Sequence, residues 1–150
     1  MPEYDKPYRE MISKMPTPTF DDLAFTRPPP LSEATVAIVT SAALHQGGVS
    51  WTPDDAHFER LPDGARNLSL GHISPNFDRA GFANDINVVY PVDRLHELAE
   101  RGVIGKVASH HYSCAGNQDD MVSTVRLDTG PKAAKQLLED GVNVVLLTPV

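Results

Sequence analysis

The chain has very little cysteine and fewer basic than acidic side chains. Cys114 is the single cysteine among 150 residues, so no disulfide can form within the chain. Chains without disulfides are typical of a reducing compartment, and we expect a cytoplasmic protein. Lys and Arg number 13 against 20 Asp and Glu, which gives a net charge of −7. Nucleic acid and anionic membranes bind clustered positive charge, so we expect neither as a partner.

Several common sequence signals are also missing. No apolar run approaches the roughly 18–20 residues of a membrane span, and the first residues lack the apolar core of a signal peptide. The pair Gly47-Gly48 has neither the Gly-x-Gly-x-x-Gly pattern nor a Gly-Lys-Ser/Thr element, which excludes the usual nucleotide sites. The Gly-x-Ser-x-Gly elbow of many hydrolases is absent as well.

The histidines do not have the spacing of a metal site. No Cys-x-x-Cys or helical His-x-x-x-His pair occurs in the chain. His110 and His111 are adjacent, and neighbouring residues of a strand point to opposite faces of a sheet. We therefore expect no metal.

Thirteen prolines divide the chain into two parts. Residues 1–33 contain many of them, including Pro28-Pro29-Pro30, and this density excludes a long helix or a central strand. We interpret this part as an arm that packs on the body or on another subunit, with a partly disordered tail as the alternative. Residues 34–150 are interpreted as one α/β domain.

That domain alternates between apolar runs and helical segments. Strands are expected at residues 34–40, 67–74, 86–90, 103–107 and 142–148. One helix is expected over residues 94–100, with Asp93 as its N-cap and Gly102 after its end. A second is expected from Pro131 to Gly141, with Ala133, Ala134, Leu137 and Leu138 on one face.

The run at 142–148 is apolar on both faces, which is typical of a strand in the middle of a parallel sheet. We therefore predict a three-layer α/β sandwich with a mainly parallel sheet. Such a sheet normally covers its last strand with another helix, whereas this chain stops at Val150. We therefore expect that a C-terminal part is missing.

Open parallel sheets bind ligands beyond the carboxyl ends of their strands. Thr40-Ser41, His110-His111 and residues 148–150 each follow an apolar run, so we expect them at one edge. Asp85 and Asn87 would share one strand face and could bind an amino or carboxylate group. Alternatively, they hydrogen-bond the backbone and hold the entry to the helix that follows.

Cys114 allows two interpretations. A thiol near His111 can be activated by a lowered pKa. Free cysteine is also among the most buried residue types and often only packs, which is the alternative that we favour.

Five segments together resemble a known family. They are residues 40–44, 74–78, 85–95, 102–105 and 111–113, which include Ser-Pro-Asn-Phe-Asp and His-Tyr-Ser. The chain from about Ala34 to Val150 resembles the selenoprotein B component of the glycine, sarcosine, betaine and D-proline reductases. The block at 85–95 combined with 111–113 carries most of this likeness.

The resemblance implies a dithiol-dependent reductase that cleaves a C–N bond of an amino acid or related amine. Members use a selenocysteine or cysteine, which is expected here just after Val150. A partner subunit would supply a pyruvoyl group, and no cofactor is expected within this chain. We hypothesise that residue 151 is encoded by a UGA codon taken as a stop; the alternative is a naturally short relative.

These inferences give a set of candidate site residues. His111 is the predicted pocket acid or hydrogen-bond donor, and Cys114 is the other catalytic candidate. The predicted substrate-binding residues are Thr40, Ser41, His72, Asp85, Asn87, Tyr112 and Ser113. Expected partners are an amine or amino-acid substrate, a thiol electron donor, and other reductase subunits or further copies of this chain. The alternative function is a non-catalytic binding or subunit-interaction module.

Overall fold

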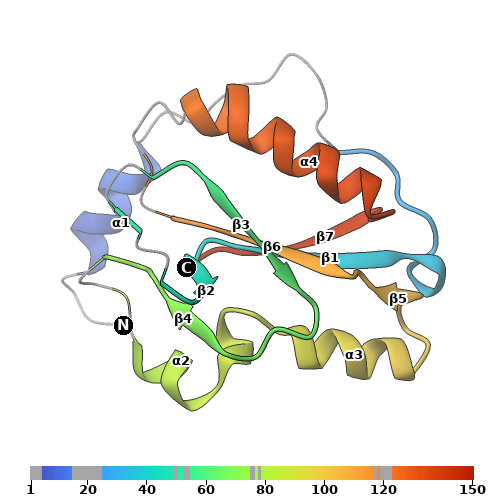
Figure 1. Cartoon of the computed structure of the whole chain (residues 1–150). Coiled ribbons are helices and arrows are strands. Elements are labelled where there is room, and N and C mark those ends of the chain that lie inside the picture. The colour runs from blue at the N-terminus through green and yellow to red at the C-terminus, as the bar shows by residue number, and fades with distance from the viewer. Residues whose placement is uncertain are drawn as a thin grey trace.

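Strand β1 (Thr35–Thr40) forms the centre of the main sheet in the computed structural model of the chain (Figure 1). Five of its six residues are β-branched, a composition that favours an extended backbone. All of them except Val39 are buried, as expected for a strand covered on both faces. The structure describes residues 5–14, 25–48, 51–52, 55–74, 77, 79–116, 118 and 123–150.

Three strands run parallel to β1, and one strand extends the sheet further. β7 (Val144–Thr148) pairs with β1 along one side, from Val36 to Thr40. β5 (Lys106–Val107) and β6 (His110–Cys114) therefore share the other side of β1. β3 (Phe58–Pro62) runs antiparallel to β6. The sheet is thus mainly parallel, in agreement with the prediction.

A smaller antiparallel ladder lies beside this sheet. β2 (Leu44–Gln46) pairs with β4 (Leu68–Leu70). No strand was expected where β2 forms, and a longer strand was expected around β4. β3 was not predicted either, because its sequence Phe-Glu-Arg-Leu-Pro has no clean apolar alternation.

Helices cover both faces of the main sheet (Figure 1). On one face lie α2 (Arg79–Asn84), the short 3-10 turn η2 (Ile86–Val88) and α3 (Val92–Glu100). Their side of the sheet holds the larger apolar core, which includes Ile38, Leu44, Tyr90, Val92 and Leu95. On the other face lies α4 (Gly130–Glu139), which follows the π-helical segment η3 (Val125–Thr129). Its smaller core includes Ala37, Tyr112, Leu137 and Val142.

The ends of the two long helices agree largely with the glycine pattern. Gly102 and Gly141 follow α3 and α4 with φ of 69° and 74°, a conformation that glycine adopts easily. The start of α3 was predicted wrongly. Its N-cap is Pro91, and Asp93 lies inside the first turn. On α4, Leu137 is buried but Ala134 and Leu138 are exposed, so the predicted apolar face is only half correct.

Two further predictions about strands differ from the structure. Residues 86–90 were expected to be extended, but Ile86–Val88 form η2 because the Asp85 carboxylate accepts a hydrogen bond from the Asn87 backbone N–H. Residues 142–148 were expected in the middle of the sheet, whereas β7 pairs only with β1 in the described part of the chain. Three of its side chains, Val145, Leu146 and Leu147, are exposed.

The N-terminal arm is only partly described. It contains α1 (Asp5–Ser13), with Pro7 in the first turn, where a missing N–H is tolerated. It continues through residues 25–30 to the 3-10 turn η1 (Leu31–Glu33). Residues 1–4 and 15–24 lie outside the described residues. Within the described ranges, no helix has both the length and the apolar character needed to cross a membrane.

Candidate functional site

The carboxyl ends of three parallel strands meet at one edge of the sheet. Thr40 of β1 is in register with Ser113 of β6 on one side and with Thr148 of β7 on the other. The sequence predicted this edge, with one error. His110 and His111 lie at the start of β6, so Ser113 and Cys114 occupy the place expected for the histidines.

Hydroxyl groups hold the last residues of the chain at this edge. The Ser41 Oγ accepts a hydrogen bond from the Val150 N–H at 2.9 Å and lies 3.4 Å from the Val150 carbonyl. The Thr148 Oγ1 donates to the Val89 carbonyl at 2.9 Å. Gly116 packs closely here, since a Cβ on it would lie 3.2 Å from the carbonyl oxygens of Ser41 and Val150. Val150, after β7, is therefore held by Ser41 and packed closely against Gly116.

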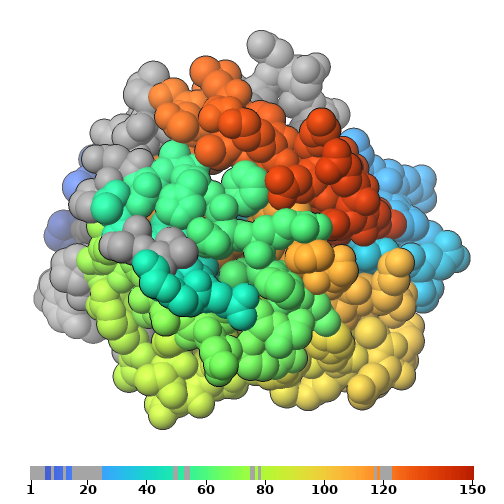
Figure 2. Space-filling view, viewed as in Figure 1, coloured from blue at the N-terminus to red at the C-terminus, as the bar shows by residue number. Residues whose placement is uncertain are grey.

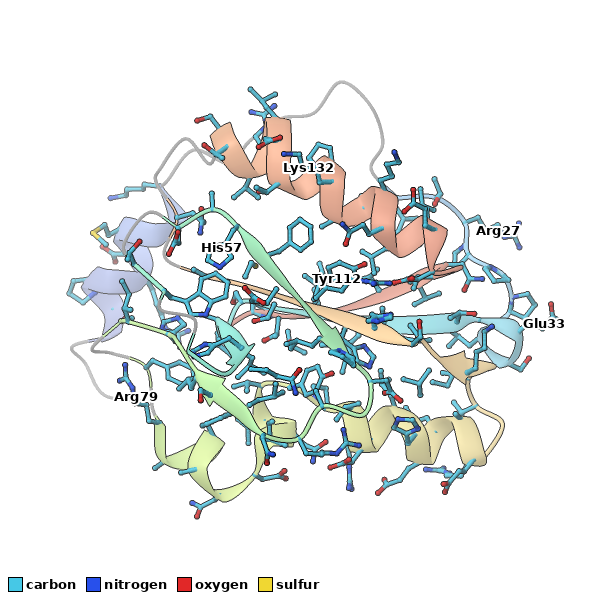
Figure 3. All side chains as sticks on the ribbon, in the orientation of Figure 1. Arg27, Glu33, His57, Arg79, Tyr112 and Lys132 are labelled. Carbon is cyan, nitrogen blue, oxygen red and sulfur yellow. The ribbon has the colours of Figure 1, made fainter. Side chains whose placement is uncertain are left out.

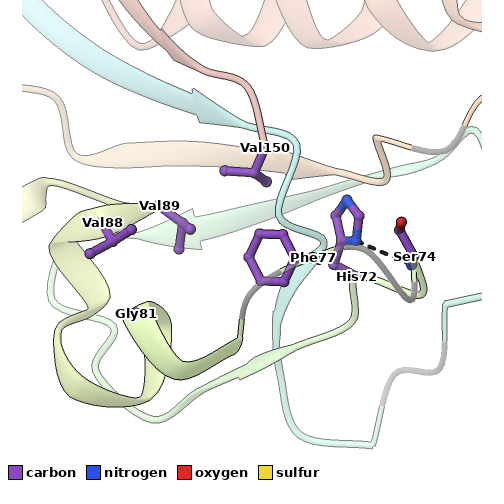
Figure 4. A pocket seen from close by; sticks show the side chains of 7 residues that line it. All are labelled: His72, Ser74, Phe77, Gly81, Val88, Val89 and Val150. Carbon is purple, nitrogen blue, oxygen red and sulfur yellow. Dashed lines mark hydrogen bonds between the residues drawn. The ribbon is translucent and has the colours of Figure 1, made fainter. Parts of the chain in front are cut away.

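A cavity of about 450 Å³ opens beside Val150 (Figure 4). Its wall is formed by residues from four segments: His72, Ser74, Phe77, Gly81, Val88, Val89 and Val150. The wall is mostly apolar, and its volume is in the range of small-molecule sites. Of the predicted substrate-binding residues, His72 lines this cavity and Ser41 holds its Val150 wall.

His72 is the main polar side chain of the cavity. It is buried, and its ring stacks on Phe77 with the centroids 4.6 Å apart. Its Nδ1 accepts a hydrogen bond from the Ser74 N–H at 3.3 Å, so a neutral ring carries its proton on Nε2. The Arg79 guanidinium donates to the His72 carbonyl at 2.7 Å and fixes the backbone at this point.

His111 lies away from the cavity and is fully buried. Its Nδ1 accepts a hydrogen bond from the Ile38 N–H at 3.0 Å, and its Nε2 lies 3.1 Å from the Asp63 carboxylate. Tyr90 packs edge-on against the ring. Burial lowers the pKa of His111, although Asp63 opposes this effect. Both nitrogens are thus engaged inside the protein, an arrangement that favours a structural role over the predicted role as pocket acid.

Tyr112 points to the opposite face of the sheet, under α4 (Figure 3). Cys114, two positions further along β6, shares that face. They line a second, smaller cavity of about 160 Å³. The Tyr112 hydroxyl lies 3.4 Å from the Asp140 carboxylate, and burial raises its pKa. Burial also raises the pKa of the Cys114 thiol. This disfavours a reactive thiolate and supports the packing alternative.

The two predicted catalytic residues are not brought together. Three positions separate His111 from Cys114 in β6, so their side chains leave the sheet on opposite faces. Ser113 shares the face of His111, and its Oγ accepts a hydrogen bond from the Leu44 N–H at 2.6 Å. The Thr40 Oγ1 accepts from the Ala42 N–H at 3.2 Å. These two hydroxyls therefore connect β1 and β6 to the segment that leads into β2.

Asp85 and Asn87 form a local network at the start of α3. The Asp85 Oδ1 accepts from the Asn87 N–H and from its Nδ2, both at 2.9 Å. The same Nδ2 donates to Asp93 at 3.0 Å, and the Asn87 Oδ1 accepts from the Asp93 N–H at 3.2 Å. Hydrogen bonds from Asn87 lower the pKa of Asp85. The geometry matches the alternative in which this pair holds the helix entry.

Sequence reasoning missed most of the cavity wall. Phe77 was inside a motif that we singled out and Val150 was expected at this edge, but no pattern indicated that Val88 and Val89 would face the same space. Asp63 was missed as well, although it contacts both His96 and His111. Pro75, Asn76 and Asp78 lie outside the described residues. Among the described residues, no group of three or more His, Cys, Asp or Glu side chains could hold a metal ion.

Comparison with known proteins adds an independent finding. The sequence model of the glycine/sarcosine/betaine reductase selenoprotein B family matches residues 64–150. The D-proline reductase subunit gamma of Acetoanaerobium sticklandii is 32% identical over 126 residues, which is 79% of this chain and 49% of that subunit. The sarcosine reductase complex component B subunit beta of Peptoclostridium acidaminophilum is 31% identical over 91% of this chain and 33% of its own length.

A third relative has a similar identity and is also matched over only part of its length. The glycine reductase complex component B subunit gamma of Carboxydothermus hydrogenoformans is 30% identical over 91% of this chain and 33% of its own length. The chain therefore spans about half to a third of these curated relatives. No solved structure matches it.

Proposed function

This chain belongs to the glycine/sarcosine/betaine reductase selenoprotein B family, and we propose that it acts in the B component of an amino-acid reductase complex. The proposed reaction is the dithiol-dependent reductive cleavage of a C–N bond in an amino acid or related amine. The matched relatives are subunits of such reductases, which supports this assignment and implies further subunits.

The cavity beside Val150 is the proposed substrate site. One observation carries this proposal: the chain leaves β7 at the carboxyl edge of the sheet, and Val150 forms part of the cavity wall. Ser41, directly after β1, fixes the backbone of Val150. Any residue that follows Val150 would begin at the cavity, where open parallel sheets bind their ligands.

We propose that a selenocysteine or cysteine follows Val150 in the native protein and supplies the nucleophile for the reductive step. The residues of this chain fit that position, because the hydrogen bonds of Ser41 and Thr148 hold the preceding backbone at the cavity. A pyruvoyl group would come from a partner subunit. The predicted three-layer sandwich is part of the same proposal, and it is supported by α3 and α4 on opposite faces of the sheet.

His72 is the proposed hydrogen-bond donor to the substrate. Its Nδ1 is an acceptor for the Ser74 N–H, which leaves the proton on Nε2 of the neutral ring. Stacking on Phe77 and the Arg79 contact to the His72 carbonyl fix the orientation of this ring. A carboxylate oxygen of the substrate is the group in the cavity that such a donor would bind.

A non-catalytic binding module is the second candidate function. It is favoured by the separation of His111 and Cys114 on opposite sheet faces and by the burial that raises the pKa of the thiol. Such a module would retain the cavity and bind a ligand or a subunit without turnover. Binding alone would not require a residue after Val150.

The intact mass of the protein purified from its native host distinguishes the reductase from the binding module. We expect a mass above that of 150 residues and a selenocysteine or cysteine after Val150.

Glycine, sarcosine, betaine and D-proline should then be tested for dithiol-dependent turnover with the native protein and its complex. Replacing the residue after Val150 by Ser should abolish turnover, and His72→Ala should weaken substrate binding while a Cys114→Ser control retains it. A native mass matching 150 residues would instead support the binding module.

A further inference from the structure

The edge strand β7 leaves an unusual amount of apolar surface uncovered. Leu147 is 68% exposed, Val145 38% and Leu146 37%, and Leu138 at the neighbouring end of α4 is 73% exposed. We call these four residues the β7 edge surface. In Figure 2, the region around β7 (red) reaches the surface between α4 (orange) and the segment near residue 30 (blue).

This strand has none of the features that protect a free edge. Residues 141–150 contain no charged side chain, and Pro149 comes only after the strand. Exposed edge strands normally carry charges, bulges or prolines that prevent pairing with another chain. Runs such as Val-Val-Leu-Leu are typical of strands paired on both sides inside a parallel sheet. The composition of β7 therefore fits a strand with a second neighbour.

The exposed side chains lie on both faces of the sheet. Val145 and Leu147 are in register with Ala37 and Val39, which face α4. Leu146 is in register with Ile38, which faces the α3 side. A partner must therefore cover two faces as well as the open hydrogen-bonding edge. A β-strand with an apolar helix alongside it meets all three requirements.

A hollow of about 510 Å³ lies next to α4 at the same edge. Leu138 and Val145 line it together with Pro28 and Pro29 of the N-terminal arm. Its place beside α4 is where a helix that accompanies a further parallel strand would pack, since consecutive parallel strands are connected by helices on the faces of the sheet. The hollow thus adjoins the exposed Leu138 and Val145 on the α4 side of β7.

We propose that the β7 edge surface binds a parallel β-strand and its helix from the part of a reductase B component that this chain does not span, an inference that rests on the proposed function. The relatives carry about two to three times as much chain as they share with this one, which provides such a unit. A second copy of this chain fits less well, because each copy carries a net charge of −7 and the two would repel.

A binding experiment with a relative tests this proposal. The probe is the part of the Acetoanaerobium sticklandii D-proline reductase subunit gamma that this chain does not match, purified separately. We expect it to form a one-to-one complex with the 150-residue chain. Leu147→Glu should weaken the affinity at least tenfold. Leu127→Glu is the matched control, because Leu127 is 80% exposed but lies in η3, outside the surface, and its change should leave the affinity unaltered.

A fusion protein tests the same proposal if the separately purified probe does not fold. In the fusion, the probe follows Val150, and amide hydrogen exchange of residues 144–148 is compared with that of the chain alone. We expect slower exchange in the fusion, and loss of that protection with Leu147→Glu. Equal exchange in both proteins, or equal binding by Leu147→Glu and the parent chain, would overturn the proposal.

Two remaining outcomes also decide the matter. If the chain alone forms a dimer that Leu147→Glu dissociates and Leu127→Glu does not, the surface binds a second copy and the proposal is wrong. If the surface binds the probe but the native mass matches 150 residues, the docking inference stands and the proposed catalytic function fails. The two proposals can therefore fail separately.

Discussion

His111 replaces a main-chain acceptor at a gap in the sheet. β5 pairs with Thr35 and Val36, and β6 begins to pair with β1 only at Val39. Ile38 lies between these pairings, and its N–H donates to the His111 Nδ1. A buried N–H without a partner would be destabilising, so the imidazole completes the hydrogen bonding of β1 at this point.

His111→Phe should lower the free energy of unfolding by about 2–4 kcal/mol. The substitution keeps an aromatic ring but leaves the Ile38 N–H and one Asp63 contact unsatisfied. His96→Ala is the control, because His96 also contacts Asp63 but is 42% exposed, and its loss should cost less than about 1 kcal/mol. Urea unfolding measures both. Equal, small losses would contradict the structural role of His111.

The buried position of His111 also predicts a pH dependence. Burial lowers its folded-state pKa below the ordinary value of 6.5. Between these two values the unfolded chain binds more protons than the folded chain, so stability rises with pH. The loss of stability due to His111 is therefore absent well above pH 6.5 and grows as the pH falls below 6.5. Urea midpoints from acid to neutral pH should show this fall in the parent protein. An identical fall in His111→Phe would refute it.

The sequence alone could not reveal this role. The His-His-Tyr cluster indicated chemistry because its residue types occur in active sites. The decisive fact is the gap between β5 and β6, which depends on how three distant strands align. His72 was easier to predict, since its neighbours Ser74 and Phe77 are local in the sequence.

At the scale of elements, the start of α3 depends on side chains rather than on the expected cap. Asn87 bridges Asp85 and Asp93, so that η2 and the first turn of α3 are held together. Asn87→Ala should lower the free energy of unfolding by about 1 kcal/mol, as the loss of a capping residue does. Substrate affinity should not change, because these hydrogen bonds occupy the Asn87 amide.

Asn67→Ala is a suitable control, because Asn67 is exposed in a loop and its loss should change stability by less than about 0.5 kcal/mol. Unfolding curves and ligand titrations on the same preparations separate the two effects. A large loss of affinity at unchanged stability would restore the prediction that Asn87 binds substrate.

Elements with local signals were predicted best. Five of the six residues of β1 are β-branched, and α3 and α4 end near glycines with positive φ. β3 was missed because its residues become a strand only by pairing with β6. The prediction of a strand at residues 86–90 was wrong for a related reason. Val88 and Val89 favour a strand, but the Asp85 side chain stabilises a turn.

At the scale of the whole molecule, an ion pair connects the outer strand of the sheet to the helix above it. Arg60 of β3 donates to both carboxylate oxygens of Asp140, at 2.6 and 2.8 Å, across β6. Asp140 follows the end of α4 and also lies 3.4 Å from the Tyr112 hydroxyl. The contact therefore fastens α4 over the Tyr112 face, while the opposite face keeps the cavity beside Val150.

A double-mutant cycle of Arg60→Ala and Asp140→Ala should give a coupling of about 0.5–1 kcal/mol, because one guanidinium nitrogen donates to both carboxylate oxygens but the Arg60 side chain is 39% exposed. The hydrogen bond from Arg60 lowers the pKa of Asp140, so the coupling should persist above pH 3.8 and disappear as the pH falls below it.

The exposed pair Lys132–Asp128 is the control and should couple by less than about 0.5 kcal/mol. Equal coupling in both pairs would show that α4 is held by its apolar contacts alone.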